Sequence, residues 1–174
     1  MRYLLIVLLA LQFASPETAV AGSYQKRQEM LVARVLQRVA VAWQVGDRNS
    51  WLDEFSDDAY FTVRFELANK GKEEIAWGHL LIFENFHADT TFDIDVQQVR
   101  FVRPGIVVVQ LGGFVATVDE GSPDTVYGTP TAVLELENEM WKIVAFQNTP
   151  FVVDEYRAYG NLRRFKAISA ANTR

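Results

Sequence analysis

The sequence contains no cysteine, and this absence excludes several kinds of chemistry. Without a thiol the chain cannot form a disulfide, carry a lipid on cysteine or use a thiolate nucleophile. Histidine is also scarce, since His79 and His87 are the only two. So few histidines, without His-x-His spacing, do not make a transition-metal site, and we predict no metal. No Gly-x-Gly-x-x-Gly follows a strand and no phosphate loop is present, so we predict no cofactor.

The chain also lacks a basic surface. It carries 17 Lys and Arg against 22 Asp and Glu, a formal net charge of −5, and its cations form no block. Proteins that bind nucleic acid concentrate positive charge on one face to neutralise phosphates. We therefore expect no nucleic-acid partner.

No hydrophobic run is long enough to cross a bilayer, although a short one lies near the N-terminus. Tyr3–Phe13 (YLLIVLLALQF) falls well below the roughly 20 residues that a spanning helix needs. Arg2 precedes this run, and Ala19-Val20-Ala21 forms a small-x-small cleavage site before Gly22. This order predicts a signal peptide at residues 1–21; an uncleaved anchor and an apolar helix of the mature protein are the alternatives. The mature protein is then secreted or periplasmic, with no membrane contact after cleavage.

The remaining length suits one globular domain. With 49% hydrophobic residues, the chain has enough apolar material for a core. We place this domain at residues 22–151 and a partly helical tail at residues 152–174. The tail is either a partly ordered end, or it packs over a pocket mouth or onto a second subunit.

Residues 43–61 show how the first half is organised. Apolar residues recur at steps of three and four through Tyr24–Val45, which predicts a long helix, and Ala40 and Ala42 allow close approach of a neighbouring element. Gly46-Asp47 breaks it, and Asp47 or Asn49 caps a short helix that contains Trp51, Leu52 and Phe55 and ends at Asp57-Asp58. The predicted elements that follow are a strand at Tyr60–Phe65 and a third helix at Lys72–Phe86, whose apolar face includes His79 and Phe83.

The second half reads as antiparallel strands. Apolar residues alternate from Phe92 to Val96, and the alternation changes parity at Gln97-Gln98, which predicts a bulge and an inward Arg100. A long strand at residues 106–118 is kinked at Gly112-Gly113. A hairpin turns at Asn138-Glu139, between strands at residues 125–137 and 140–149. Helices followed by long bent strands predict an α+β fold, a cone-shaped curved antiparallel sheet wrapped around N-terminal helices, with a pocket between them.

Several short motifs follow one another in a set order between about Val35 and Phe151. They are Gly46-Asp47, Phe55 with Asp57-Asp58-Ala59, Gly71-x-x-x-Ile75-x-x-x-His79-x-x-x-Phe83, Val99-Arg100-Phe101 before Pro104, and the closing Trp141–Pro150 (WKIVAFQNTP). Together they resemble the SnoaL-like domains of the nuclear-transport-factor-like superfamily, and within it most closely the SgcJ/EcaC group. The resemblance implies the cone fold (also called cystatin-like), a homodimer through the sheet and an apolar pocket.

The resemblance does not carry a mechanism with it. Steroid isomerases of this superfamily use a tyrosine and two carboxyl groups, and the corresponding positions here hold Val39, Val63 and Ala132. None of these side chains can transfer a proton, so that mechanism is not expected. The SgcJ/EcaC group is often labelled oxidoreductase, but no motif in this chain supports redox work.

His79 is the main candidate for chemistry, because imidazole titrates near neutral pH and can act as a general base. It is a catalytic residue, a ligand contact, or a core histidine bonded to a backbone carbonyl or to Gln147. An inward Arg100 needs a carboxylate from the protein or from a ligand, and the remaining alternative is that Arg100 is exposed. The further candidate ligand contacts are Tyr60, Thr62, Phe83 and Gln147.

These candidates lead to three functional hypotheses. The first is a secreted domain that binds a small, largely apolar molecule in the pocket of the cone. The second is an enzyme without a cofactor, an isomerase, hydrolase or cyclase that uses His79. The third is a structural or interaction module whose cavity is filled by its own side chains and which works through the sheet face or the tail. The sequence itself leaves open whether any reaction is catalysed.

Overall fold

The computed structural model describes residues 16–62, 68–81, 83–84, 94–112, 114–116 and 126–151. The predictions for residues 1–15, Val63, Phe86, His87 and the tail at 152–174 lie outside the described residues. Three helices precede most of the strands: α1 (Pro16–Gln44), α2 (Arg48–Asp53) and α3 (Gly71–Leu81). The strands are β1 (Phe55–Thr62), β2 (Ala68–Lys70), β3 (Asp95–Arg103), β4 (Ile106–Gly112), β5 (Phe114–Ala116), β6 (Val126–Gly128), β7 (Thr131–Glu137), β8 (Met140–Gln147) and β9 (Pro150–Phe151).

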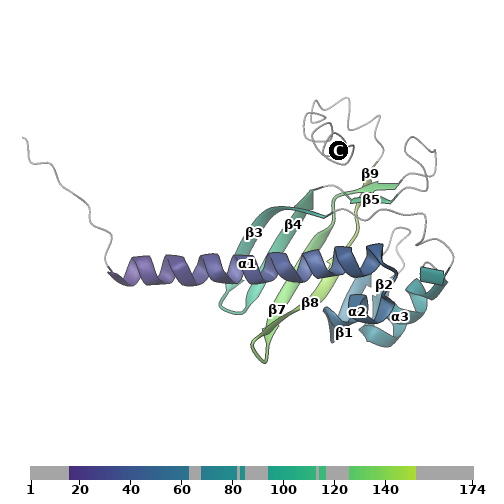
Figure 1. The fold of residues 1–174 in the computed structure, drawn as a ribbon, viewed down its shortest axis with the longest axis horizontal. Helices are drawn as coiled ribbons and strands as arrows, with labels where there is room; N and C mark the ends of the chain where they lie inside the picture. The colour runs from purple at the N-terminus through teal and green to yellow at the C-terminus, as the bar shows by residue number, and fades with distance from the viewer. Residues whose placement is uncertain are drawn as a thin grey trace, which may run out of the picture.

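The sheet and the helices form two layers, which confirms the predicted α+β fold. Six strands lie in the order β2-β1-β8-β7-β4-β3, and a small second sheet has the order β5-β6-β9. All described pairs are antiparallel except β1 with β8. Helix α1 crosses one face of the twisted six-stranded sheet (Figure 1). We call this face of the sheet inner and the opposite face outer.

The core lies between α1 and the inner face. Helix α1 contributes Val32, Leu36, Val39 and Trp43 from one side, since residues three and four apart share a face. The inner face contributes side chains from the four central strands: Phe55, Ala59, Phe61, Val107, Val109, Leu111, Ala132, Leu134, Trp141, Ile143 and Phe146. The apolar side chains that recur periodically in the helix and in the strands thus pack together in one layer.

Helix α1 is longer than the sequence pattern predicts. It begins at Pro16 rather than near Tyr24, and its N-terminal end extends beyond the sheet (Figure 1). The side chains of Ala21–Arg27 are exposed, and the first buried one is Gln28, whose Oε1 accepts a 2.8 Å hydrogen bond from Trp141 Nε1. The helix ends where Gly46 has a φ of 72°, a conformation that glycine adopts at little cost.

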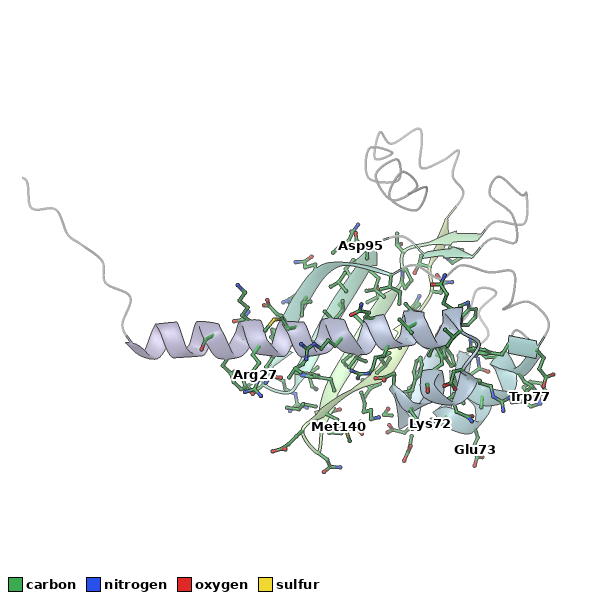
Figure 2. The ribbon with its side chains drawn as sticks, in the orientation of Figure 1. Arg27, Lys72, Glu73, Trp77, Asp95 and Met140 are labelled. Atoms are coloured by element: carbon green, nitrogen blue, oxygen red, sulfur yellow. The ribbon has the colours of Figure 1, made fainter. Side chains whose placement is uncertain are left out.

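Two predictions about the short helices were wrong. The second helix ends at Asp53, so Phe55 belongs to β1 rather than to the helix. Trp77 in α3 is one of the large aromatic residues that the sequence places in the core rather than in a binding cage. The structure shows instead that Trp77 is 79% exposed and points away from the sheet (Figure 2).

Three irregularities of the sheet were predicted correctly. The register of β3 against β4 shifts between Val96 and Gln98, which is the expected bulge. The strand after Ile106 breaks next to Gly112, and its two parts, β4 and β5, belong to different sheets. Asn138 and Glu139 both have positive φ, 47° and 67°. A two-residue hairpin turn needs positive φ at both positions to match the twist of its two strands.

Candidate functional site

His79 lies inside an aromatic cluster between the helices and β1. It is 2% exposed, which confirms its predicted inward position. The centroid of its ring is 4.6 Å from that of Phe61, 4.7 Å from that of Trp51 and 6.4 Å from that of Trp43. Phe83, also buried, packs on Trp43 with centroids 5.0 Å apart. The space around the imidazole is thus occupied by the protein's own rings.

The hydrogen bond of His79 fixes its tautomer. Its Nδ1 lies 2.8 Å from the carbonyl oxygen of Ile75, one turn earlier in α3. Because a carbonyl oxygen can only accept, Nδ1 carries the proton and the neutral ring has its lone pair on Nε2. Burial among apolar rings lowers the pKa of His79, an effect that the bond to Ile75 opposes in part. The imidazole is therefore neutral at pH 7, and this geometry is the core-histidine alternative that the sequence left open.

Trp51 adds an unusual feature to the same cluster. Among the described residues, its buried indole N–H has no hydrogen-bond acceptor. An unpaired buried donor costs about 1–3 kcal/mol. Sequence reasoning identified Trp51 as an apolar residue of the short helix, and no signal in the sequence indicates that its N–H is unpaired.

Tyr60, Thr62 and Gln147 come together, but on the outer face and not in a pocket with His79. Thr62 pairs with Gln147 in the parallel β1–β8 ladder, and Tyr60 pairs with Ala145. Tyr60 is 50% exposed, while its neighbour Phe61 is buried. The inward position predicted for Gln147 was wrong, because β8 bulges near Val144. That extra residue turns Phe146 inward and Gln147 outward.

Arg100 is also on the outer face, contrary to the prediction. It is exposed, while Val99 and Phe101 pack against the core. The predicted bulge is present, but it has the opposite consequence. The extra residue compensates for the change of parity, so that Ile94 and Val96 before it and Val99 after it all remain on the core side. Arg100 therefore needs no buried partner.

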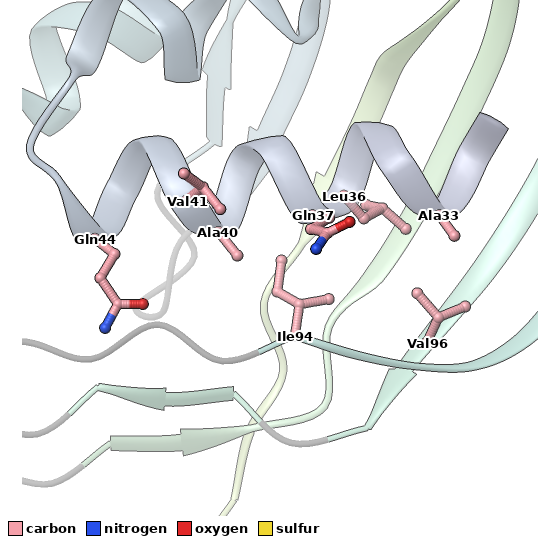
Figure 3. A pocket seen from close by; sticks show the side chains of 8 residues that line it. All are labelled: Ala33, Leu36, Gln37, Ala40, Val41, Gln44, Ile94 and Val96. Atoms are coloured by element: carbon pink, nitrogen blue, oxygen red, sulfur yellow. The ribbon is translucent and has the colours of Figure 1, made fainter. Parts of the chain in front are cut away.

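A groove lies instead on the flank of α1, beside the start of β3. Its volume is about 370 Å³, within the usual range of small-molecule sites. Helix α1 forms one wall, and Ile94 and Val96 form the other (Figure 3). The α1 side chains that line it are Ala33, Leu36, Gln37, Ala40, Val41 and Gln44. The two alanines leave the space, since larger side chains at their positions would fill it.

The lining of the groove is apolar and uncharged. Six of the eight described lining residues are aliphatic, and the other two, Gln37 and Gln44, are exposed carboxamides. None of the eight titrates near neutral pH. The described part of the chain also contains no group of three or more His, Asp or Glu side chains that could hold a metal ion. The groove offers shape, apolar contact and neutral hydrogen bonds, but its described lining has no general acid or base.

Sequence reasoning noted Ala40 but did not predict this groove. The signal is the spacing of Ala33, Gln37, Ala40 and Gln44, which follows steps of four, three and four beside the core face. Such a stripe of small and neutral polar residues indicates a second, less filled flank of the helix. Its other wall comes from the start of β3, far along the chain from α1, and no local pattern predicts that pairing.

Comparisons with known proteins agree on the fold. No family model matches the chain, and no curated protein matches it. Among solved structures, it is similar to a domain of unknown function with a cystatin-like fold from Nostoc punctiforme, with a TM-score of 0.62, 21% identity, and coverage of 83% of this chain and 96% of that one.

Two further solved structures have names that suggest activities. A putative scytalone dehydratase from Novosphingobium aromaticivorans matches with a TM-score of 0.65 and 12% identity, over 75% of this chain and 89% of that one. A ketosteroid isomerase-like protein from Erwinia carotovora matches with a TM-score of 0.58 and 15% identity, over 71% and 95%. At such identities the likeness concerns the fold alone. The chain therefore has the cystatin-like, NTF2-like fold, with N-terminal helices on one face of a six-stranded curved sheet.

Proposed function

We propose that this protein binds a small, largely apolar molecule in the groove between α1 and β3 and does not transform it. The observation that carries the proposal is the groove itself, about 370 Å³ in volume and lined mainly by aliphatic side chains. A groove of this kind removes apolar ligand surface from water, at roughly 25 cal/mol per Å². It contains no described residue that could move a proton at neutral pH.

The geometry of His79 favours binding over catalysis. A general base must come within hydrogen-bond reach of the proton that it removes. The ring of His79 is enclosed by Trp43, Trp51 and Phe61, with Nδ1 held by the backbone. The activities in the names of the structural neighbours therefore do not carry over to this chain through His79.

The binding proposal is tested by filling the groove. Ala40→Trp places an indole over Ile94 and should strongly reduce binding of the neutral apolar dye N-phenyl-1-naphthylamine, measured by fluorescence titration. Ala33→Phe fills the other end of the groove and provides a second test if Ala40→Trp folds poorly. Ala68→Trp adds the same indole at an exposed position of β2, on the opposite sheet edge, and should leave binding unchanged. If the dye binds the folded groove variants as well as the original protein, the proposal is wrong.

We also propose that the protein is a homodimer through the outer face of the sheet. Val108, Val133 and Ala145 form an adjacent, half-buried apolar row there, which continues to Tyr60. Val133→Glu would place a charge at the centre of this row. We expect it to convert a dimer to a monomer in analytical ultracentrifugation, and a monomer in the unaltered protein would refute this proposal.

We also propose that the protein is exported, with residues 1–21 as its signal peptide. Cleavage after Ala21 would leave every described buried residue of α1 in the mature chain, since the first of them is Gln28. No described helix is long and apolar enough to cross a membrane. N-terminal sequencing of the exported protein should therefore begin at Gly22. The ordered motifs from Gly46-Asp47 to Pro150 support a place among the SnoaL-like proteins, near the SgcJ/EcaC group.

A further inference from the structure

The two carboxamides of the groove have no protein partners among the described residues. Neither Gln37 nor Gln44 makes a side-chain hydrogen bond there, and both are exposed. They lie along the same wall of the groove, with Ala40 between them on α1 and Ile94 on the facing wall (Figure 3). Each carboxamide can donate and accept, so each can bond a hydroxyl, ether or carbonyl group of a ligand.

Helix geometry sets the distance between these two groups. Seven residues at about 1.5 Å each separate Gln37 from Gln44 by roughly 10 Å along α1. The part of the wall between them is apolar, because its lining residues are Ala40 and Val41.

The absence of charged residues from the lining restricts the ligand further. A carboxylate, phosphate or ammonium group in the groove would lose part of its hydration and find no opposite charge among the eight lining residues. Asp95 lies between Ile94 and Val96 in the sequence, but its side chain is exposed. Side chains alternate along a strand, so Asp95 points to the face opposite the groove. Neutral polar groups carry no such penalty, because a carboxamide can replace one of their bonds to water.

We propose that the ligand of this groove is an uncharged, elongated molecule with an apolar centre and two neutral oxygen-bearing groups, spaced to match Gln37 and Gln44. These two residues then determine the specificity of the groove. This inference rests on the proposed function, because it assumes that the groove is the binding site. It defines which molecules of similar length and hydrophobicity the groove rejects.

The probes are three eight-carbon molecules: 1,8-octanediol, octanoate and 1,8-diaminooctane, each titrated into the full chain at pH 7.5 by calorimetry. We expect the diol to bind at least about tenfold more tightly than either charged probe. Gln37→Leu and Gln44→Leu should each weaken diol binding by about three- to tenfold, the usual net value of one hydrogen bond. Gln98→Leu is the matched control, since it removes an exposed glutamine from β3 outside the groove.

Introducing negative charge into the groove provides the converse test. The double variant Gln37→Glu/Gln44→Glu should bind the diamine more tightly than the diol. Equal binding of the three probes, no binding of the diol, or unchanged affinity in both leucine variants would overturn the inference. If the naphthylamine dye still binds and Ala40→Trp still abolishes that binding, the ligand class is wrong while the groove remains the site. If Ala40→Trp does not affect binding of the dye, the groove is not the binding site and the proposed function itself is wrong.

Discussion

The burial of His79 makes a quantitative prediction about acid stability. The unfolded chain protonates this histidine near its ordinary pKa of 6.5, whereas burial holds the pKa lower in the folded state. Below pH 6.5 the unfolded state therefore binds a proton that the folded state does not. Stability falls as the pH drops from 6.5 toward the folded pKa, and it is fully present above that range.

Linkage sets the largest size that this effect can reach. One unit of pKa difference is worth about 1.4 kcal/mol. A ring that stays neutral throughout would cost about 2 kcal/mol of stability between pH 7.5 and 5, and this value is the upper limit. The groups described around the ring are the aromatic side chains of Trp43, Trp51 and Phe61 and the backbone carbonyl of Ile75, none of which titrates in this range.

The measurement is urea unfolding of the original protein and of His79→Phe at several pH values between 7.5 and 5. The acidic residues are the same in both proteins, so the difference between the two pH profiles isolates His79. We expect the phenylalanine variant to lose less stability over this range, by up to about 2 kcal/mol. His79→Leu serves the same purpose if phenylalanine fits badly. Parallel profiles would show that the imidazole is protonated in the folded state, and the enclosed cluster described above would then be wrong.

Two further predictions concern contacts that hold the helices in place. Arg38 donates two hydrogen bonds to the buried carboxylate of Glu54, one of them from Nη2 to Oε2 at 2.7 Å. Arg38→Met removes both and should lower the free energy of unfolding by about 2 kcal/mol in chemical denaturation. Because the Arg38 side chain is partly exposed, this cost is smaller than for a fully buried pair. Arg34→Met, one turn earlier and without a described partner, should cost less than about 0.5 kcal/mol, and equal losses would contradict the argument. Gly71→Ala forces a side chain into a φ of 78°, with its Cβ 3.2 Å from the carbonyl oxygen of Asp57, and should lower the melting temperature by several degrees, at a cost of about 1–2 kcal/mol. An unchanged melting temperature would show that the backbone there relaxes without strain.

The sequence predicts the elements of this fold better than their faces. Helical periodicity, Gly46-Asp47 and the Asn138-Glu139 turn are local signals, and each element that they predict is present. Helix boundaries were less accurate, because α1 begins before the residues that its apolar pattern marks. The end of α2 was also misplaced, since Phe55 is apolar and buried in either a helix or a strand, and only its pairing with Ile143 assigns it to β1.

The errors in the candidate site come from bulges. A bulge inserts one residue, and whether it moves a side chain to the other face depends on the register of the partner strand. The bulge of β3 was predicted but keeps Val99 inside, and the bulge of β8 was missed and turns Gln147 outside. Both strands read plausibly in either register, so Arg100 and Gln147 were placed on the wrong face. The groove escaped prediction for a related reason, since its walls come from α1 and β3 and meet only through tertiary packing.

The exposure of Trp77 gives this protein a built-in optical reporter. Three of its four tryptophans, Trp43, Trp51 and Trp141, sit among apolar side chains, whereas Trp77 faces solvent. Water shifts indole emission to longer wavelength, and a soluble quencher such as iodide reaches only an accessible ring. A Trp77→Phe variant should thus emit at shorter wavelength and resist iodide, and its fluorescence would then report on the protein interior alone.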